Sequence, residues 1–183
     1  MTDHDTPARG AGSTDAADDG LRARLRWSAP DGAIHDGPRR YLMIRPDVLM
    51  GVLRRLPVDE RARAVEAFAD SVAEHGVDSI RAYFRQVGED PSALLASTVR
   101  AAADLGWGAW RFETGSGRLA LAVDGSPFAQ GFGPSDEPVC APIRGMLRAV
   151  AGVGAGVGAD VREVRCVACG APRCEFEARW AGC

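Results

Sequence analysis

Apolar side chains recur at two different spacings along this chain, and the change falls near Gly106. Before this point they repeat every three or four residues, which is the period of a helix that buries one face. After it, short runs alternate between large and small side chains, as in strands with one buried face. Helices that come first and antiparallel strands that come later predict an α+β fold, with N-terminal helices packed on an antiparallel sheet.

Four helices are expected in the first part of the domain, after a strand over 40–44. Pro46 and Pro91 suit the first turn of a helix, where a missing N–H needs no partner, and Asp90 is placed to cap the fourth helix. Gly76 is read as a C′ glycine that separates the second helix from the third. The expected helices span 46–56, 59–75, 77–87 and 91–105.

Two hairpins and a fifth helix are expected in the second part. A Thr-Gly-Ser-Gly turn at 114–117 connects the first pair of strands, and a turn rich in cysteine connects the second pair. The Gly/Pro-rich stretch 126–138 between them is expected to be a loop. The strands are expected at 107–113, 118–124, 161–167 and 174–180, and the helix at 141–153.

The N-terminal part of the chain has a different composition. Residues 1–20 hold almost no large apolar side chain, so they cannot offset the entropy of ordering and are expected to be disordered. Residues 21–38 contain Trp27 among two prolines and two glycines, which indicates a linker or a loosely docked arm. The domain division is therefore 1–38 for tail and linker and 39–183 for the folded domain.

Composition and charge exclude several classes of protein. The 183 residues are 46% hydrophobic and 26% charged, which suits one soluble domain. A net charge of −3 offers no basic field for nucleic acid. No apolar run approaches the roughly 20 residues that span a bilayer, and the first residues do not resemble a signal peptide. We therefore expect a cytoplasmic protein without membrane or nucleic-acid partners.

The cysteines predict a metal site. In a reducing compartment clustered cysteines favour a metal over disulfides, and the count of five is odd. By spacing alone, Cys166, Cys169 and Cys174 together with Cys140 offer four thiolates to a tetrahedral zinc ion. Cys140 directly precedes a predicted helix, whose N-terminus favours a negative thiolate. Cys183 is excluded because it is the last residue.

An iron–sulfur cluster is the alternative occupant of the same cysteines. Four thiolates are what such a cluster requires, and it would make the protein a redox component. The spacing between the cysteines fits no well-defined cluster run.

The cysteine pattern also suggests a family. It reads Pro138-Val-Cys140, then Glu163, then Cys166-x3-Gly170-x3-Cys174-x-Phe176. This pattern resembles the 4-vinyl reductase domain, and the resemblance covers about residues 39–180. The family takes its name from a protein of bacteriochlorophyll synthesis and includes ligand-sensing domains of aromatic-responsive bacterial transcription activators. The resemblance implies a fold similar to TRAPP subunits, in which a zinc-pinned C-terminal hairpin helps to enclose an apolar cavity. It also implies a homodimer.

The resemblance implies a particular set of zinc ligands. Carried over to this chain, they are Cys140, Glu163, Cys166 and Cys174, so Cys169 competes with Glu163 as the fourth ligand. Residues 163 and 166 would point to opposite faces of a regular strand, and a bulge or bend must therefore separate them if both bind. Four ligands from the protein mark a structural zinc site.

A ligand pocket is expected to be apolar and aromatic. The candidate residues are Tyr83, Phe84, Trp107, Trp110 and Phe128, although each of them is also suited to ordinary core packing. Trp107 and Trp110 lie three positions apart at the start of a strand. They are therefore expected to face opposite sides, so that only one lines the pocket.

Catalytic groups are scarce in this sequence. The three histidines form no set with a serine or cysteine nucleophile, and no dinucleotide-binding glycine motif supplies a hydride source. The first hypothesis is therefore a zinc-stabilised binding domain for a hydrophobic or aromatic small molecule, with a tetrapyrrole intermediate as one option. The alternatives are a 4-vinyl reductase or reductase accessory protein in bacteriochlorophyll synthesis, and a stand-alone effector-sensing domain.

Overall fold

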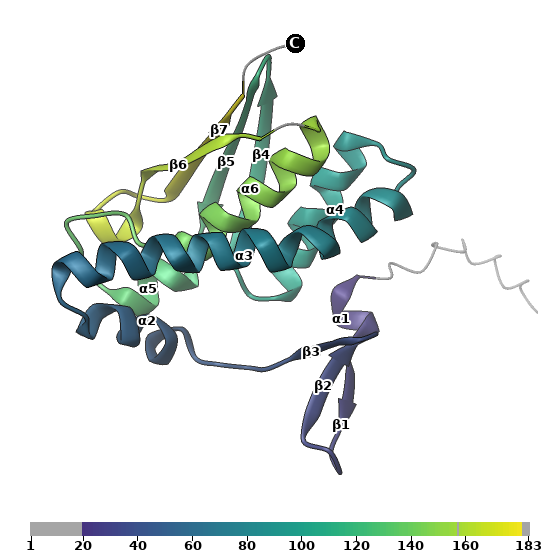
Figure 1. Ribbon diagram of the computed structural model, residues 1–183, viewed down its shortest axis with the longest axis horizontal. Helices are drawn as coiled ribbons and strands as arrows, with labels where there is room; N and C mark the ends of the chain where they lie inside the picture. Colours follow the sequence, from purple (N-terminus) through teal and green to yellow (C-terminus); the bar gives the residue numbers. More distant parts are fainter. Residues whose placement is uncertain (1–19, 157, 181–183) are drawn as a thin grey trace, which may run out of the picture.

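The computed structural model describes residues 20–156 and 158–180 and has an α+β fold (Figure 1). A four-stranded antiparallel sheet forms one layer, and helices pack against it. A separate three-stranded antiparallel sheet lies near the N-terminus, at the opposite side of the long helix α3 (Figure 1). The fold class predicted from the sequence is confirmed for the helices and the antiparallel sheet.

Residues 20–41 form an N-terminal arm with regular structure, where the sequence predicted a linker. The arm consists of α1 (Leu21–Arg24), β1 (Arg26–Ser28), β2 (Ala33–Asp36) and β3 (Arg39–Tyr41). Its strands pair in the order β1-β2-β3 and project away from the rest of the molecule (Figure 1). The disorder predicted for residues 1–20 falls almost entirely on residues outside the described ranges.

The arm is held to the body through α1. The backbone N–H of Arg22 donates to the carboxylate of Asp104 at 3.0 Å. Arg24 pairs with Asp36 within the arm at 3.2 Å and donates to the hydroxyl of Tyr83 in the body at 3.1 Å. These contacts are polar and few, so the arm is attached at one end only.

The apolar residues of the expected strand 40–44 do not pair. β3 ends at Tyr41, and the strap Leu42–Ile44 crosses from the arm to the body with Leu42 and Met43 76% and 78% exposed. A strand needs a neighbour to satisfy its backbone groups, and the sheet of the arm ends one residue before the strap. The prediction of a strand is therefore wrong over Leu42–Ile44.

Two of the helices expected from the sequence form one. After α2 (Pro46–Arg55), α3 runs without a break over Val58–Gln86, so the interpretation of Gly76 as a helix end is wrong. A Cβ atom at Gly76 would lie 3.2 Å from the side chain of Met146. The glycine thus allows another helix to pack close to α3 and does not terminate it.

The partner of α3 is α6 (Ala141–Ala155), and a second glycine brings them together. A Cβ atom at Gly145 would lie 2.2 Å from the carbonyl oxygen of Ala69 in α3. Arg144 of α6 also forms an ion pair with Glu66 of α3 at 2.7 Å. The two helices therefore touch backbone to backbone along their crossing.

The fourth predicted helix is confirmed as α4 (Pro91–Asp104). The Asp90 carboxylate accepts hydrogen bonds from the backbone N–H groups of Ser92 and Ala93, as expected of an N-cap. α4 packs against α3 and against the first strand of the main sheet.

The main sheet contains the two predicted hairpins. Its strands are β4 (Ala109–Gly115), β5 (Arg118–Asp124), β6 (Asp160–Arg165) and β7 (Cys174–Arg179), in the order β4-β5-β7-β6. Alternate residues of β5 and β7 are buried, while charged pairs such as Arg118 and Glu177 cover the other face. One face of the sheet thus forms the core together with the helices.

A short helix occupies part of the predicted Gly/Pro loop. α5 (Pro127–Phe132) begins after Ser126, whose hydroxyl accepts from the N–H of Ala129. Phe128 and Phe132 lie four residues apart, so both reach the core from one helical face. Gly131 faces α2, and a Cβ atom there would lie 2.5 Å from the Pro46 carbonyl oxygen. Its missing side chain lets α5 pack against α2.

No helix in the described ranges is both long enough and apolar enough to cross a membrane.

Candidate metal centre

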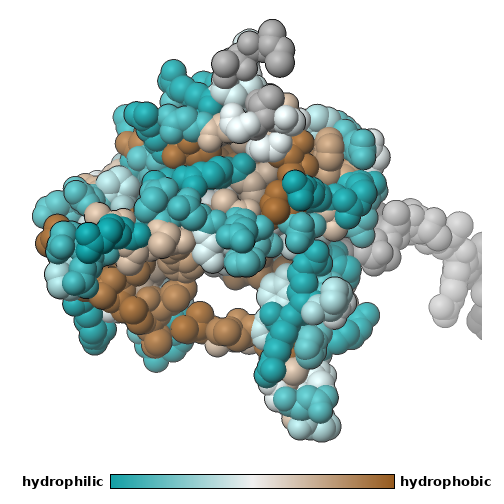
Figure 2. Space-filling view, in the orientation of Figure 1, coloured by the Kyte–Doolittle hydropathy of each residue, from teal (hydrophilic) through white to brown (hydrophobic). Residues whose placement is uncertain are grey.

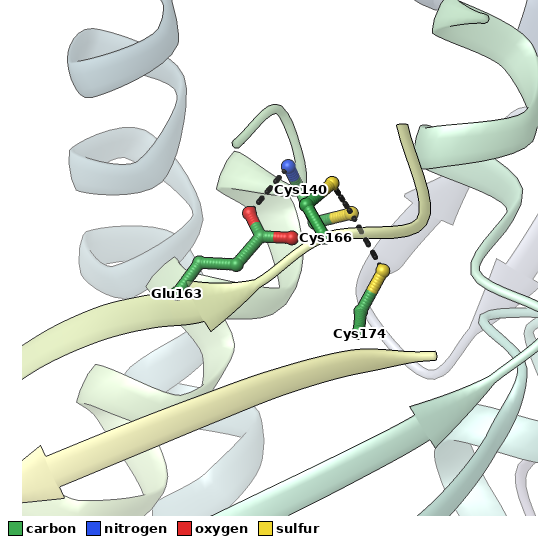
Figure 3. Close-up of side chains that lie close together, drawn as sticks. All are labelled: Cys140, Glu163, Cys166 and Cys174. Carbon is green, nitrogen blue, oxygen red and sulfur yellow. Dashed lines mark hydrogen bonds between the residues drawn. The ribbon is translucent and has the colours of Figure 1, made fainter. Parts of the chain in front are cut away.

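Four side chains from three distant segments converge at one end of the main sheet (Figure 3). Cys140 is the N-cap of α6, Glu163 lies in β6, Cys166 directly follows β6, and Cys174 begins β7. One ligand atom from each lies within 4.8 Å of all the others. Cys140 Sγ is 3.6 Å from Cys174 Sγ and 4.0 Å from Cys166 Sγ. The cluster could therefore hold one metal ion.

A bulge turns Glu163 and Cys166 to the same side. β6 pairs with β7 in register up to Glu163 opposite Phe176, and the register shifts before Arg165 opposite Glu175. The extra residue of a bulge reverses the alternation of side chains beyond it. The bulge that the sequence required, if both residues were to face one site, is confirmed.

The turn between β6 and β7 positions the sulfur atoms of Cys166 and Cys174. It contains the 3₁₀ helix η1 (Val167–Cys169) and ends at Gly170, whose φ of +86° suits a residue without a Cβ atom. The N–H of Val167 donates to Cys174 Sγ at 3.3 Å. Backbone groups of the turn thus support a negative charge on the sulfur.

Cys169 does not belong to the cluster. Its side chain is exposed, whereas Cys140, Cys166 and Cys174 are buried. Its backbone N–H closes the turn by donating to the Cys166 carbonyl at 3.0 Å. Cys183, which the sequence reasoning excluded, lies outside the described residues.

The carboxyl group of Glu163 has one satisfied and one unsatisfied oxygen. Oε2 accepts from the backbone N–H of Cys140 at 2.9 Å, while Oε1 is buried and has no hydrogen-bond partner. Figure 3 shows the carboxylate and the sulfur atoms facing the same space. Burial, together with the negative charge of Cys166, raises the pKa of Glu163 from 4.5 to about 8. A buried acceptor without a partner is costly, and a bound cation would remove this cost.

The three thiols share their protons unequally. Hydrogen bonds from Cys140 and Cys174 stabilise the charged form of Cys166, so the pKa of Cys166 lies far below its ordinary value. The pKa of Cys140 is raised, because it donates to Cys166 and is buried. One of the three sulfurs is therefore already a thiolate, the form that binds metal.

The spacing of the sulfurs fits a tetrahedral ion. Around zinc, with bonds of about 2.3 Å to sulfur, two thiolates lie about 3.8 Å apart. The observed separations of 3.6 and 4.0 Å bracket this value. The set of three thiols and one carboxyl group, with an orphaned buried oxygen, suits zinc.

Ser126 also contacts the cluster, and the sequence reasoning did not identify it as part of the site. Its Oγ lies 3.2 Å from Cys140 Sγ, and the residue is 1% exposed. The Ser-Pro pair signals a helix start, but it gives no indication that the hydroxyl faces a cysteine fourteen residues away.

Three of the predicted pocket residues form one aromatic cluster. The ring of Trp107 lies edge-on to Phe128 at 5.1 Å and 6.5 Å from the ring of Trp110. The expectation that Trp107 and Trp110 face opposite sides is wrong, since the indole N–H of Trp110 also donates to the Trp107 carbonyl. β4 starts only at Ala109, and Gly108 with a φ of +95° breaks the alternation between the two tryptophans.

Tyr83 and Phe84 have other surroundings. Tyr83 lines an open pocket of about 290 Å³ between α1, α3 and α4, and Phe84 packs partly buried against the core. A second open pocket, of about 590 Å³, lies between α3 and α6 and includes Ala73 and Val153. Neither pocket is lined by the aromatic cluster of Trp107, Trp110 and Phe128. The enclosed apolar cavity therefore stays a prediction.

Comparisons with known proteins agree with the resemblance seen in the sequence. The family model of the 4-vinyl reductase domain matches residues 119–180, which include all four residues of the cluster. The fold is similar to that of the phenol-responsive sensory domain of the transcription activator PoxR with phenol. That likeness has a TM-score of 0.73 and 22% sequence identity, and it covers 87% of this chain and 86% of that chain.

Two further structures resemble the chain less closely. One is a trafficking protein particle complex subunit 3 from Naegleria fowleri covalently bound to palmitic acid, with a TM-score of 0.49, 14% identity and coverage of 73% of this chain and 93% of that one. The other is a vinyl-4-reductase family protein from Methanocaldococcus jannaschii, with a TM-score of 0.45, 13% identity and coverage of 76% and 96%. No curated protein matches the chain in sequence.

Proposed function

We propose that this chain, whose residues 119–180 form a 4-vinyl reductase domain, is a binding domain for a small hydrophobic or aromatic molecule and is stabilised by a structural zinc ion. The observation that carries the proposal is the buried group of Cys140, Glu163, Cys166 and Cys174 around one point, with Glu163 Oε1 left without a partner. The zinc ion would be held by these four side chains.

The role of the ion follows from its ligands. Four protein ligands fill a tetrahedral zinc site and leave no position open for a substrate. The ion would neutralise thiolate charge and join the start of α6 to the turn between β6 and β7. Cys140 and Cys174 are 34 residues apart in sequence, so this link would fix the sheet against the helix that packs on α3.

The aromatic cluster supports a binding function. Trp110 and Phe128 are 3% and 5% exposed, whereas Trp107 is only half-buried and reaches the surface beside them. Trp107 thus offers an aromatic wall that an incoming ring can contact. The fold shared with a phenol-responsive sensory domain makes a phenolic molecule the first ligand to test. A sensor that works as a separate chain would transmit binding to a partner protein.

The test measures binding of phenol to the zinc-loaded protein by isothermal titration calorimetry, with protoporphyrin IX as a probe for tetrapyrroles. Saturable binding of phenol supports the phenolic class, and binding of the porphyrin alone moves the proposal to the tetrapyrrole class. Trp107→Leu should weaken binding at least several-fold. The control is Trp27→Leu, since Trp27 lies in the N-terminal arm and is 66% exposed. Absence of binding by either probe contradicts the binding function.

We also propose that the domain acts as a homodimer, as the family resemblance implies. An apolar patch supports self-association: it consists of the strap Leu42–Ile44 together with Val48 and Val52 on α2, all of them 48–78% exposed. Figure 2 shows this patch as a continuous hydrophobic band below the body of the molecule. Apolar surface of this extent on a monomer indicates an interaction site.

A further inference from the structure

We propose that Ser126 is a positioning residue of the metal centre, whose hydroxyl donates a hydrogen bond to the metal-bound thiolate of Cys140 and ties the centre to α5. The inference rests on the zinc site proposed above. It assigns a role to a buried hydroxyl outside the four ligand residues.

The geometry places the Ser126 hydroxyl between two partners. Its Oγ lies 3.2 Å from Cys140 Sγ and 3.4 Å from the backbone nitrogen of Ala129. Ser126 and Cys140 are 1% and 0% exposed, so water does not compete for either group. A serine hydroxyl carries one proton and two lone pairs, which suffices for one donated and one accepted bond.

Metal binding fixes the direction of these bonds. A thiolate bound to zinc has no proton and can only accept a hydrogen bond. The Ser126 hydroxyl must then donate to Cys140 Sγ, while its lone pair accepts from the N–H of Ala129. The resulting chain runs from the α5 backbone through the hydroxyl to the sulfur. Both partners keep their hydrogen bonds only when the hydroxyl points toward the metal centre.

α5 is connected to the centre at both ends. Ser126 starts the helix, and beyond its end the N–H of Ser135 donates to the carbonyl of Ala168 in η1 at 2.9 Å. η1 lies within the turn that carries Cys166 and Cys174. Phe128, two residues after Ser126, is buried and contacts Trp107. The hydroxyl thereby links the metal centre to the wall of the proposed ligand site.

Outer hydrogen bonds of this kind hold a metal ligand in place and adjust its charge. Their loss typically costs about 10- to 100-fold in metal affinity. A donated hydrogen bond also stabilises the lone pairs of the sulfur. The absorption band of a cobalt-substituted site that arises from thiolate-to-metal charge transfer should therefore move to longer wavelength when the bond is lost.

The experiment compares Ser126→Ala with the wild type and with Thr98→Val. Thr98 is a matched control, because its hydroxyl is also buried, 3% exposed, and bonds to the Leu94 carbonyl within α4. Zinc affinity is measured by competition with a coloured chelator, and the charge-transfer band is recorded with cobalt(II). We expect Ser126→Ala to weaken zinc binding about 10- to 100-fold and to shift the band, while Thr98→Val changes neither.

A Ser126→Ala protein with the zinc affinity and the cobalt band of the wild type overturns the inference. Ser126→Thr keeps the hydroxyl and should retain both properties, so it decides the question if the alanine variant does not fold. A folded Ser126→Thr protein that loses both properties also overturns it. A wild-type protein that binds neither zinc nor cobalt refutes the metal site itself, and this outcome is distinct from a failure confined to Ser126.

Discussion

At the scale of single residues, Glu163 connects the metal centre to pH. Its pKa of about 8 in the metal-free protein lies above the ordinary value of 4.5, mainly because the carboxyl group is buried. Between these two values the folded protein holds a proton that the unfolded chain releases. The free energy of unfolding therefore falls as the pH rises through this range, and the stabilising contribution is complete only below 4.5.

We predict that metal-free, reduced protein loses stability as the pH rises from about 5 to about 8, by up to about 1.4 kcal/mol per pH unit from Glu163. Glu163→Gln keeps the shape of the side chain but does not titrate, so this variant should show a smaller slope. Urea unfolding followed by circular dichroism at several pH values measures the slope.

The control for this experiment is Glu177→Gln. Glu177 lies on the outer face of the sheet, and the hydrogen bond from Arg179 lowers its pKa. It therefore stays charged across the same range, and its substitution should leave the slope of the wild type unchanged. Equal slopes in Glu163→Gln and in the wild type would show that Glu163 is ionised at low pH and that its burial has no such effect.

The residues of the metal centre were only partly predictable from sequence. The tight turn around Gly170 indicated that Cys166 and Cys174 come close, and they do. The preference for Glu163 over Cys169 came from the family resemblance, because spacing alone does not tell which side chain faces inward. The contact of Ser126 with Cys140 is tertiary, and no local pattern in the sequence reports it.

At the scale of elements, glycines determine how closely α3 and α6 approach. The sequence reasoning interpreted Gly76 as a helix end, since glycine is the usual C′ residue. The continuous α3 shows that packing requirements can place a glycine inside a helix. Such a glycine cannot be distinguished from a capping one without knowledge of the partner helix. The α5 helix was missed for a related reason, because its Gly131 serves close packing against α2.

We predict that Gly145→Ala lowers the free energy of unfolding by about 1–3 kcal/mol or more, because the new methyl group would overlap the Ala69 carbonyl oxygen. Gly154→Ala is the matched control within α6. Its methyl group would meet only the Leu94 side chain at 3.8 Å, an ordinary contact, and alanine favours helix. This control should leave stability unchanged or raise it by up to about 1 kcal/mol. Thermal unfolding of both variants tests the prediction, which fails if the two behave alike.

At the scale of the whole molecule, the N-terminal arm and the strap depart most from expectation. A linker was expected there because prolines and glycines dominate residues 21–38, yet these residues form the turns of a three-stranded sheet. Gly32 and Gly37 both have positive φ values, at the two turns of that sheet. The overall α+β order was predictable, since helical and alternating periods are local properties. The extended placement of the arm depends on which surfaces it meets, and the sequence does not specify this.

We predict that the protein is a dimer in solution and that the double substitution Leu42→Ser and Met43→Ser shifts it to the monomer. Both side chains are more than three-quarters exposed, so the change removes apolar surface without opening the core. Size-exclusion chromatography with light scattering gives the mass. Val164→Ser is the control, because Val164 is also exposed, at 53%, but lies on β6 and far from the strap in sequence. A wild-type protein that is monomeric at its highest soluble concentration contradicts the prediction.

The central claim is that three thiolates and one carboxylate hold a single zinc ion that stabilises the fold. Its most direct test is the zinc content of freshly purified protein by elemental analysis, for the wild type, Cys174→Ser and Cys169→Ser. The buried cluster predicts about one zinc ion per chain in the wild type and in Cys169→Ser, since Cys169 is exposed and outside the cluster. Cys174→Ser should lose the metal and melt at a lower temperature. Zinc-free wild-type protein that nevertheless melts at the same temperature with and without added zinc would contradict the claim.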